Sequence, residues 1–185
     1  LQPARLHHHR GTNGVPGPGT PKAVGPQWER FEVNQLGATI GAELDGIDLA
    51  VDLAVDLDDA TIAEIRAALL AYKVIFFRDQ HLSPSQHVAF AKRFGELEVH
   101  PFISANPDHP ELVRFEKGAD AGGYENGWHS DVTWRVEPSM GAVLHAVSVP
   151  PTGGDTLFCD MAAVYDGLSD DTRARVDDLV AVHDY

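Results

Sequence analysis

The stretch Asn126–Gly141, NGWHSDVTWRVEPSMG, places a histidine and an aspartate two residues apart between two tryptophans. Its pattern is typical of a buried strand, on which residues i and i+2 point to the same face. His129 and Asp131 would then lie side by side, with their Cα atoms about 6–7 Å apart. An imidazole and a carboxylate at that spacing can bind one small cation together, or they can simply hydrogen-bond to each other. Both interpretations are open at this point.

The cysteine count and the histidine–carboxylate pair together favour iron(II) over structural zinc. The chain has a single cysteine, Cys159, which excludes an internal disulfide and a cysteine zinc cluster. A histidine beside a carboxylate suits non-haem iron(II), which is commonly held by two histidines and one carboxylate on one face of the metal. If iron binds here, we expect a further histidine on a distant strand.

Composition limits the class of protein. The 185 residues are enough for one domain with a substantial core, and 43% of them are hydrophobic. Fourteen Lys and Arg residues face 28 Asp and Glu residues, giving a formal net charge of −14. This charge disfavours binding to nucleic acid or to an anionic membrane surface. With no long apolar run and no signal-peptide pattern, the sequence predicts a soluble, cytoplasmic protein.

The chain divides into an arm and a domain. Residues 1–27 are rich in glycine and proline without apolar periodicity, and we expect a flexible arm. Residues 28–185 form the predicted domain. It opens with a glycine-punctuated hairpin over 31–50, continues with an amphipathic helix over 58–72, and then enters a dense apolar strand over 73–80.

The clearest helix signal is LSPSQHVAFAKRFG, residues 82–95. Ser83 is the predicted N-cap and Pro84 stands at the first helical position. Gln86 completes a capping box, and Gly95 ends the helix.

The second half of the domain is predicted to be rich in strands. A short helix is expected over residues 169–179, with Ser169 as its N-cap. Strands are predicted within residues 111–116, 128–134, 140–150, 150–160 and 180–185. Because strands outnumber helices, the fold class is α+β, mainly β.

Three segments carry a resemblance to a known family. WHSDVT (Trp128–Thr133) is followed by PTGGDTL (Pro151–Leu157), and upstream lies KVIFFRDQHLSPSQHVAFAKRFGELEVHP (residues 73–101). In this order they resemble the TauD/TfdA family of Fe(II)- and 2-oxoglutarate-dependent dioxygenases, and the similarity runs from about Phe31 to Tyr185. The resemblance implies a double-stranded β-helix, or jelly roll, with flanking helices. It also implies a C-terminal part missing from this chain, because the family's distal iron histidine and its 2-oxoglutarate-binding arginine lie well downstream.

The resemblance assigns roles to six residues. His129 and Asp131 correspond to iron ligands, and Thr156 to the threonine that contacts the 2-oxoglutarate carboxylate. The remaining three, which would contact substrate, are His100, Glu125 and Trp128. From the residues alone, Thr156 is better explained as a β-forming residue after a turn, and His100 is equally well explained as a solvated loop residue.

The family activity implied is hydroxylation of a small organic anion, using O2 and releasing succinate and CO2. Sulfonates, sulfate esters and aryloxy or carboxylate compounds are the expected substrate types. Glu125 stands where taurine-type members carry asparagine, and an acid there disfavours taurine itself. The resemblance also implies a homo-oligomer, either a dimer or a tetramer.

Two other functions compete with this one. Because the chain supplies two of three iron ligands, it can instead be a catalytically incomplete jelly-roll fragment that serves as a metal-binding or scaffold protein. A histidine- and aspartate-dependent hydrolase with a different metal is the third alternative, although it leaves the Gly-Gly-Asp-Thr motif unexplained.

Overall fold

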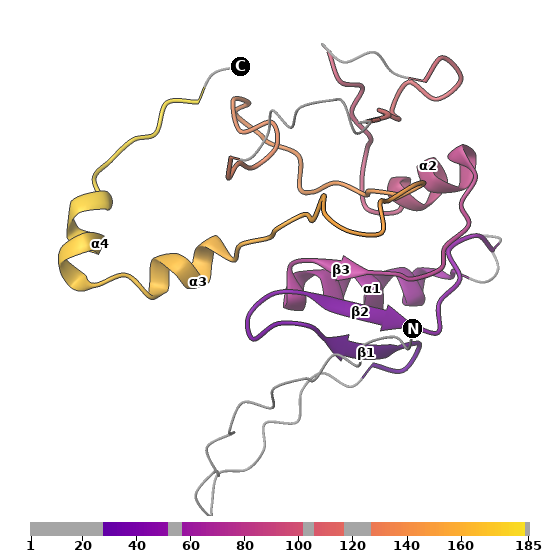
Figure 1. Cartoon of the computed structure of the whole chain (residues 1–185), viewed down its shortest axis with the longest axis horizontal. Helices are drawn as coiled ribbons and strands as arrows, with labels where there is room; N and C mark the ends of the chain where they lie inside the picture. Colours follow the sequence, from indigo (N-terminus) through magenta and orange to yellow (C-terminus); the bar gives the residue numbers. More distant parts are fainter. Residues whose placement is uncertain (1–27, 52–56, 102–105, 117–126, 184–185) are drawn as a thin grey trace, which may run out of the picture.

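The computed structural model describes residues 28–51, 57–101, 106–116 and 127–183 (Figure 1). The predicted arm over residues 1–27 lies outside them. None of the helices in the described ranges is long and apolar enough to cross a membrane. In chain order the elements are β1 (Glu32–Gln35), β2 (Ala42–Asp45), α1 (Asp59–Tyr72), β3 (Ile75–Phe76), α2 (Pro84–Lys92), α3 (Met161–Asp166) and α4 (Asp170–Val176).

The predicted hairpin is confirmed and forms the edge of a small sheet. β1 pairs with β2 antiparallel, with Val33 opposite Leu44, and β2 pairs with β3 parallel. Gly41 has a φ of +93°, a backbone conformation that favours glycine, and its N–H donates to the Tyr72 carbonyl at 2.9 Å. The turn therefore both closes the hairpin and ties it to the end of α1.

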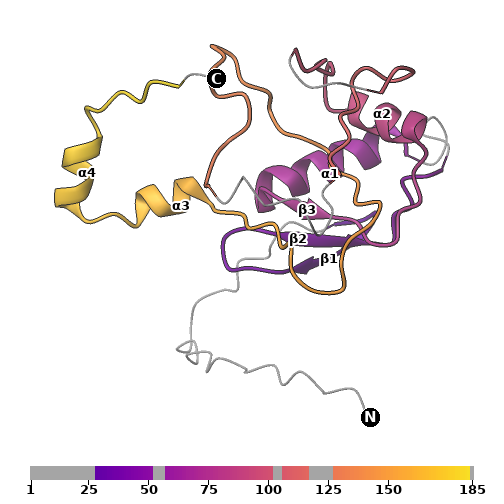
Figure 2. The same ribbon diagram turned by 45° about the horizontal axis from the view of Figure 1, so that its top comes forward.

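Helix α1 packs its apolar face on this sheet (Figure 2). Ile62, Ile65 and Ala68 recur at helical spacing and are buried. They share one core cluster with Leu44 of β2 and Phe90 of α2. The predicted helix and strand are thus both present, although the strand is limited to two residues.

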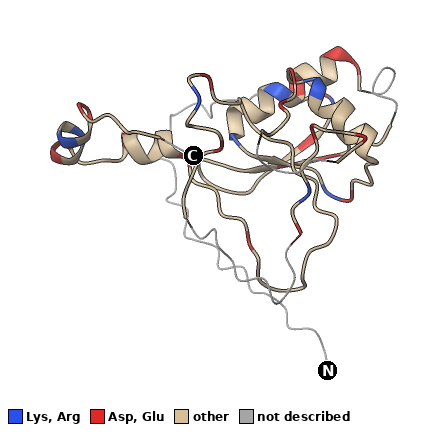
Figure 3. Cartoon of the chain, turned by 90° about the horizontal axis from the view of Figure 1, so that it is seen from above, with Lys and Arg blue, Asp and Glu red and all other residues tan. Residues whose placement is uncertain are grey.

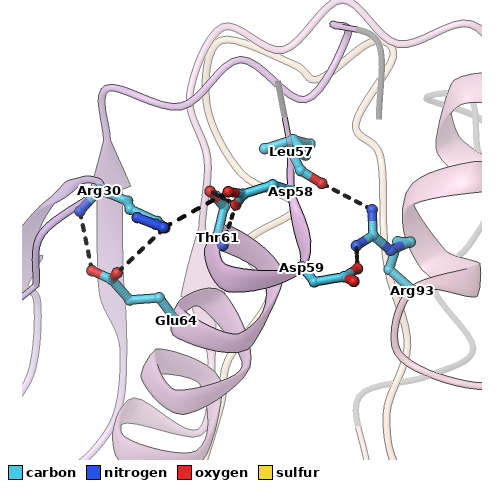
Figure 4. Close-up of polar contacts among 7 residues, drawn as sticks. All are labelled: Arg30, Leu57, Asp58, Asp59, Thr61, Glu64 and Arg93. Carbon is cyan, nitrogen blue, oxygen red and sulfur yellow. Dashed lines mark hydrogen bonds and ion pairs between the residues drawn. The ribbon is translucent and has the colours of Figure 1, made fainter. Parts of the chain in front are cut away.

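Polar contacts hold the N-terminus of α1 in place (Figure 4). The Asp58 carboxylate caps the helix by accepting hydrogen bonds from the Thr61 N–H and hydroxyl, both at 2.7 Å. The Arg30 guanidinium lies 3.8 Å from Asp58 and 4.0 Å from Glu64. The Thr61 hydrogen bonds, ahead of the nearby cations, hold the pKa of Asp58 below its usual range.

The capping box predicted for α2 is confirmed. The Gln86 N–H donates to the Ser83 hydroxyl, and the Ser83 N–H donates to the Gln86 side chain at 2.9 Å. At the other end of α2, Arg93 donates to the Leu57 carbonyl at 2.9 Å and pairs with Asp59 at 2.6 Å (Figure 4). Arg93 therefore links the end of α2 to the start of α1.

The strands predicted after residue 110 are wrong for the residues that the structure describes. Val113 forms an isolated bridge, and no strand is present over 127–160 or 180–183. A strand persists through ladder hydrogen bonds to a neighbour, and within the described ranges these segments have no ladder partner. Their apolar side chains stay exposed, as in Leu144, Val147 and Leu157. Helices therefore outweigh strands in the described residues, in contrast to the mainly-β prediction.

Two short helices lie to one side of the sheet layer (Figures 1 and 2). The predicted helix beginning after Ser169 is confirmed as α4, whose acidic first turn and basic last turn suit the helix dipole. Figure 3 shows charges of both signs on this helix. Helix α3 was not predicted. Its signals are an N-cap, Asp160, which accepts from the Ala163 N–H at 3.2 Å, and a glycine directly after the helix, Gly167.

Candidate metal and cosubstrate site

His129 precedes a turn that begins at Asp131, and neither residue lies on the predicted strand. The chain bends over residues 131–134, closed by the Arg135 N–H donating to the Val132 carbonyl at 3.0 Å. Val132 has a φ of +47°, which is unfavourable for a β-branched residue. The two side chains still meet, with His129 Nε2 and Asp131 Oδ1 3.3 Å apart. Both are largely exposed, at 66% and 72% of the side chain.

This geometry suits two adjacent positions around one metal ion. Ligand atoms that each lie about 2.1 Å from an ion, at right angles, are about 3.0 Å apart. The 3.3 Å separation is close to that value. The His129 ring donates from Nδ1 to the Gly127 carbonyl at 3.1 Å, and this leaves Nε2 as the nitrogen that can bind a metal. His129 Nε2 and Asp131 Oδ1 are also close enough for the direct contact that the sequence offered as the alternative.

The described residues do not complete a three-ligand set. Within the described ranges, no group of three His, Cys, Asp or Glu side chains is close enough to hold a metal ion. His183 comes near the turn, where its Nδ1 lies 2.8 Å from the Thr133 hydroxyl. The further histidine that iron requires is therefore not supplied by the part of the chain that the structure describes.

Thr156 lies at a different place, on an apolar recess of about 210 Å³. The recess is formed by the β1–β2 loop, the start of β3 and the segment 156–158. Its lining includes Ile40, Phe76 and Phe158, but neither His129 nor Asp131. The structure thus does not bring Thr156 together with the histidine and aspartate.

Two of the three predicted substrate residues are described, and both lie outside helices and strands. His100 is half-buried after α2, and Trp128 is 70% exposed beside His129. Glu125 lies outside the described residues. The structure therefore does not test the prediction that these three side chains lie together.

An ion pair connects the segment after α2 with the turn after Asp131, and the sequence motifs did not indicate it. Arg135 Nη2 lies 2.6 Å from Glu98 Oε1, and the Ser139 hydroxyl donates to the other Glu98 oxygen at 3.1 Å. The Arg135 guanidinium also lies over the Trp134 ring, 4.9 Å from its centroid. Glu98 precedes His100 closely and Arg135 follows Asp131 closely. The sequence shows that Glu98 and Arg135 have opposite charges, but nothing in the sequence around either residue indicates that they pair.

Comparison with known proteins identifies the family. Residues 32–185 match the family described as "Taurine catabolism dioxygenase TauD, TfdA family". Because this match covers most of the chain, the protein belongs to that family. The resemblance drawn from WHSDVT and PTGGDTL is thereby confirmed.

Individual relatives are similar over about half of their own length. The (S)-phenoxypropionate/alpha-ketoglutarate-dioxygenase of Sphingobium herbicidovorans is 39% identical, over 83% of this chain and 53% of that protein. The alpha-ketoglutarate-dependent sulfate ester dioxygenase of Pseudomonas putida is 38% identical, over 87% of this chain and 52% of that protein. The chain thus spans about half the length of the curated relatives that it matches.

Solved structures show the same relationship. A taurine dioxygenase from Burkholderia xenovorans is 40% identical and superimposes with a TM-score of 0.69, covering 81% of this chain and 52% of the other. AAD-2, crystallised with Mn(II) and N-oxalylglycine, is 31% identical with a TM-score of 0.56, covering 80% and 50% of the two chains. The jelly-roll prediction is supported by this likeness, while the described residues themselves carry only three short strands.

Proposed function

We propose that this chain is part of an Fe(II)- and 2-oxoglutarate-dependent dioxygenase in which His129 and Asp131 provide two of the iron ligands. The observation that carries the proposal is the 3.3 Å approach of His129 Nε2 to Asp131 Oδ1, inside the range that matches the family. The remaining iron ligand and the group that binds the far carboxylate of 2-oxoglutarate would come from outside the described residues.

The chain's own residues would bind and orient the reactants. When bound, iron(II) with 2-oxoglutarate supplies O2 activation coupled to release of succinate and CO2. The hydrogen bond from His129 Nδ1 to the Gly127 carbonyl leaves Nε2, which lies beside Asp131 Oδ1, as the nitrogen that would bind the metal. The Thr156 hydroxyl would donate a hydrogen bond to a carboxylate oxygen of 2-oxoglutarate.

We infer a small organic anion as substrate. Similar proteins include a dioxygenase named for (S)-phenoxypropionate and one named for sulfate esters. Phenoxypropionate joins an aromatic ring to a carboxylate, and a sulfate ester carries an anionic sulfate group. In this proposal, Trp128 would offer an aromatic face to the apolar body and His100 a hydrogen bond to the anion, with Glu125 as the third substrate contact. A homo-dimer or homo-tetramer is the proposed assembly.

The direct test is an anaerobic titration of the purified protein with Fe(II) and 2-oxoglutarate, followed by visible absorption. Chelation of the iron by 2-oxoglutarate should produce a charge-transfer band that His129→Ala and Asp131→Ala each remove. His109→Ala is the matched control, because His109 lies elsewhere, with Nε2 3.1 Å from the Ser85 hydroxyl. That variant should keep the band.

The outcomes separate the competing functions. A band lost in both ligand variants and kept in the control supports the dioxygenase. Metal binding without a band would favour the alternative, a metal-binding or scaffold protein without catalysis. A band that survives Asp131→Ala would refute the assignment of Asp131 as a ligand.

A further inference from the structure

The turn that begins at Asp131 is attached to the segment after α2 through Arg135. The backbone N–H of Arg135 donates to the Val132 carbonyl at 3.0 Å and closes the turn. The guanidinium of the same residue reaches Glu98, with Nη2 2.6 Å from Oε1. Arg135 therefore contacts the turn with its backbone and a distant segment of the chain with its side chain.

The contact between Glu98 and Arg135 is partly shielded from water. The two side chains are 26% and 35% exposed, and the atoms Glu98 Oε1 and Arg135 Nε are both buried. The second Glu98 oxygen accepts a hydrogen bond from the Ser139 hydroxyl at 3.1 Å. A shielded carboxylate that loses its cation keeps the cost of desolvation without the compensating attraction. The arrangement therefore favours keeping residues 135–139 against Glu98.

The turn needs contacts that hold it, because its backbone is unfavourable. Val132 has a φ of +47°, and a β-branched residue keeps such a conformation only where its surroundings impose it. One contact from elsewhere in the chain joins His183 Nδ1 to the Thr133 hydroxyl at 2.8 Å, but it is exposed to solvent. The ion pair between Glu98 and Arg135 is better shielded, so it is the stronger candidate for holding the turn.

The conformation of this turn decides whether the two predicted metal ligands meet. Asp131 is the first residue of the turn, and its Oδ1 lies 3.3 Å from His129 Nε2. Both side chains are largely exposed, so packing around them does not keep these atoms together. Their approach depends instead on the backbone that carries them. A contact that stabilises the turn therefore raises the fraction of molecules in which both ligand atoms are in place.

We propose that Glu98 and Arg135 are positioning residues for the metal. Their ion pair holds the turn in the conformation that brings the Asp131 carboxylate to His129. The proposal rests on the proposed function, because it assumes that these two residues bind the metal; neither Glu98 nor Arg135 contacts the ion. Since Glu98 lies two residues before His100, the same ion pair also ties the turn to the segment with the predicted substrate histidine.

The test measures Mn(II) binding to variants of the full chain, from the electron paramagnetic resonance signal of the free ion. Arg135→Met and Glu98→Gln each remove one charge of the pair, and the double variant removes both. Arg135→Lys keeps a cation at this position. Glu111→Gln is the matched control, because Glu111 lies 3.5 Å from Lys92 Nζ in another ion pair and is similarly shielded, at 20% exposure.

Two further measurements separate binding at this site from other effects. His129→Ala reports the Mn(II) that binds elsewhere on the chain, for example to the histidines at positions 7–9, and this amount is subtracted. Hydrogen exchange of the residue 135 amide, which closes the turn, is followed without metal. The exchange rate reports loosening of the turn independently of any ligand.

Arg135→Met and Glu98→Gln should each weaken Mn(II) binding by about fivefold and speed exchange of the residue 135 amide by a similar factor, the scale of losing one net hydrogen bond. The double variant should lose no more than either single variant, because both act through one contact. Arg135→Lys should recover most of the Mn(II) affinity. Glu111→Gln should match the unmodified protein in both measurements.

The direction of the two effects distinguishes positioning from electrostatics. A direct effect of charge on a cation would make Arg135→Met bind Mn(II) more tightly and Glu98→Gln less tightly, and this result would overturn the proposal. Unchanged affinity and unchanged exchange in both variants would also overturn it, as would an equal loss in Glu111→Gln. These outcomes leave the proposed function standing. If the unmodified protein bound no more Mn(II) than His129→Ala, the proposed function would fail, and this proposal with it.

Discussion

Replacing Ile65 by alanine should destabilise the folded layer by about 3 kcal/mol. Ile65 is 0% exposed and belongs to the same core cluster as Leu44 and Phe90. The substitution removes three carbon atoms, which corresponds to about 2.4 kcal/mol at roughly 0.8 kcal/mol per buried methylene. The space left behind adds a cavity term, since the surrounding residues close it only partly. The sum lies within the ~2–5 kcal/mol range typical of such changes.

Thermal unfolding followed by circular dichroism at the helix band measures this effect. For a chain of this size, each kcal/mol shifts Tm by roughly 2–4 °C, so Ile65→Ala should lower Tm by about 6–12 °C. Ile65→Val removes one methyl group and should cost about 1 kcal/mol. Leu70→Ala is the control on the same helix, because Leu70 is 67% exposed and should change stability by less than about 0.5 kcal/mol.

Equal Tm shifts for Ile65→Ala and Leu70→Ala would refute the reasoning. Such a result would mean that α1 does not bury the face containing Ile65 against the sheet.

Three further predictions concern local features. Ser83→Ala removes the capping box of α2 and should lower stability by about 1 kcal/mol, measured by denaturant unfolding. The pKa values of Asp58 and Asp160 are lowered in the folded state, so these carboxylates stabilise the fold above about pH 4, their ordinary pKa. This stabilisation is lost as pH falls through the folded-state pKa values. Tm measured from pH 6 to pH 2 should therefore fall, and it should fall less steeply in Asp160→Asn. Gly41→Ala should destabilise by about 1 kcal/mol or more because φ is +93°, whereas Gly127→Ala, with open space around it, should be nearly neutral in the same unfolding assay.

Features that depend on neighbouring residues could be predicted from the sequence. The capping box at Ser83, the cap at Ser169 and the hairpin turn at Gly41 arise from contacts among residues a few positions apart. The closeness of His129 and Asp131 has the same origin. Although the predicted strand is a turn, two residues separated by one position can meet in either conformation.

Features that depend on distant partners could not be predicted. The segment 140–150 has the composition of a strand, but a strand also needs a neighbour that completes its hydrogen-bond ladder. The pairing of Glu98 with Arg135 and of Lys73 with Asp160 likewise joins residues far apart in the chain. Opposite charges are common in the sequence, and their identity alone does not say which of them meet.

The sequence by itself determined the family, the local helix caps and the pair of residues that we assign to the metal. These depend on motifs and on short-range geometry, which the order of residues specifies directly. Only the tertiary structure decided that His129 and Asp131 are exposed at the start of a turn, and that Thr156 lies on a separate apolar recess. It also decided that Lys73 pairs with Asp160. The reason is that long-range contacts result from packing of the whole chain, in which burial and hydrogen bonding select one arrangement among many that the local sequence allows.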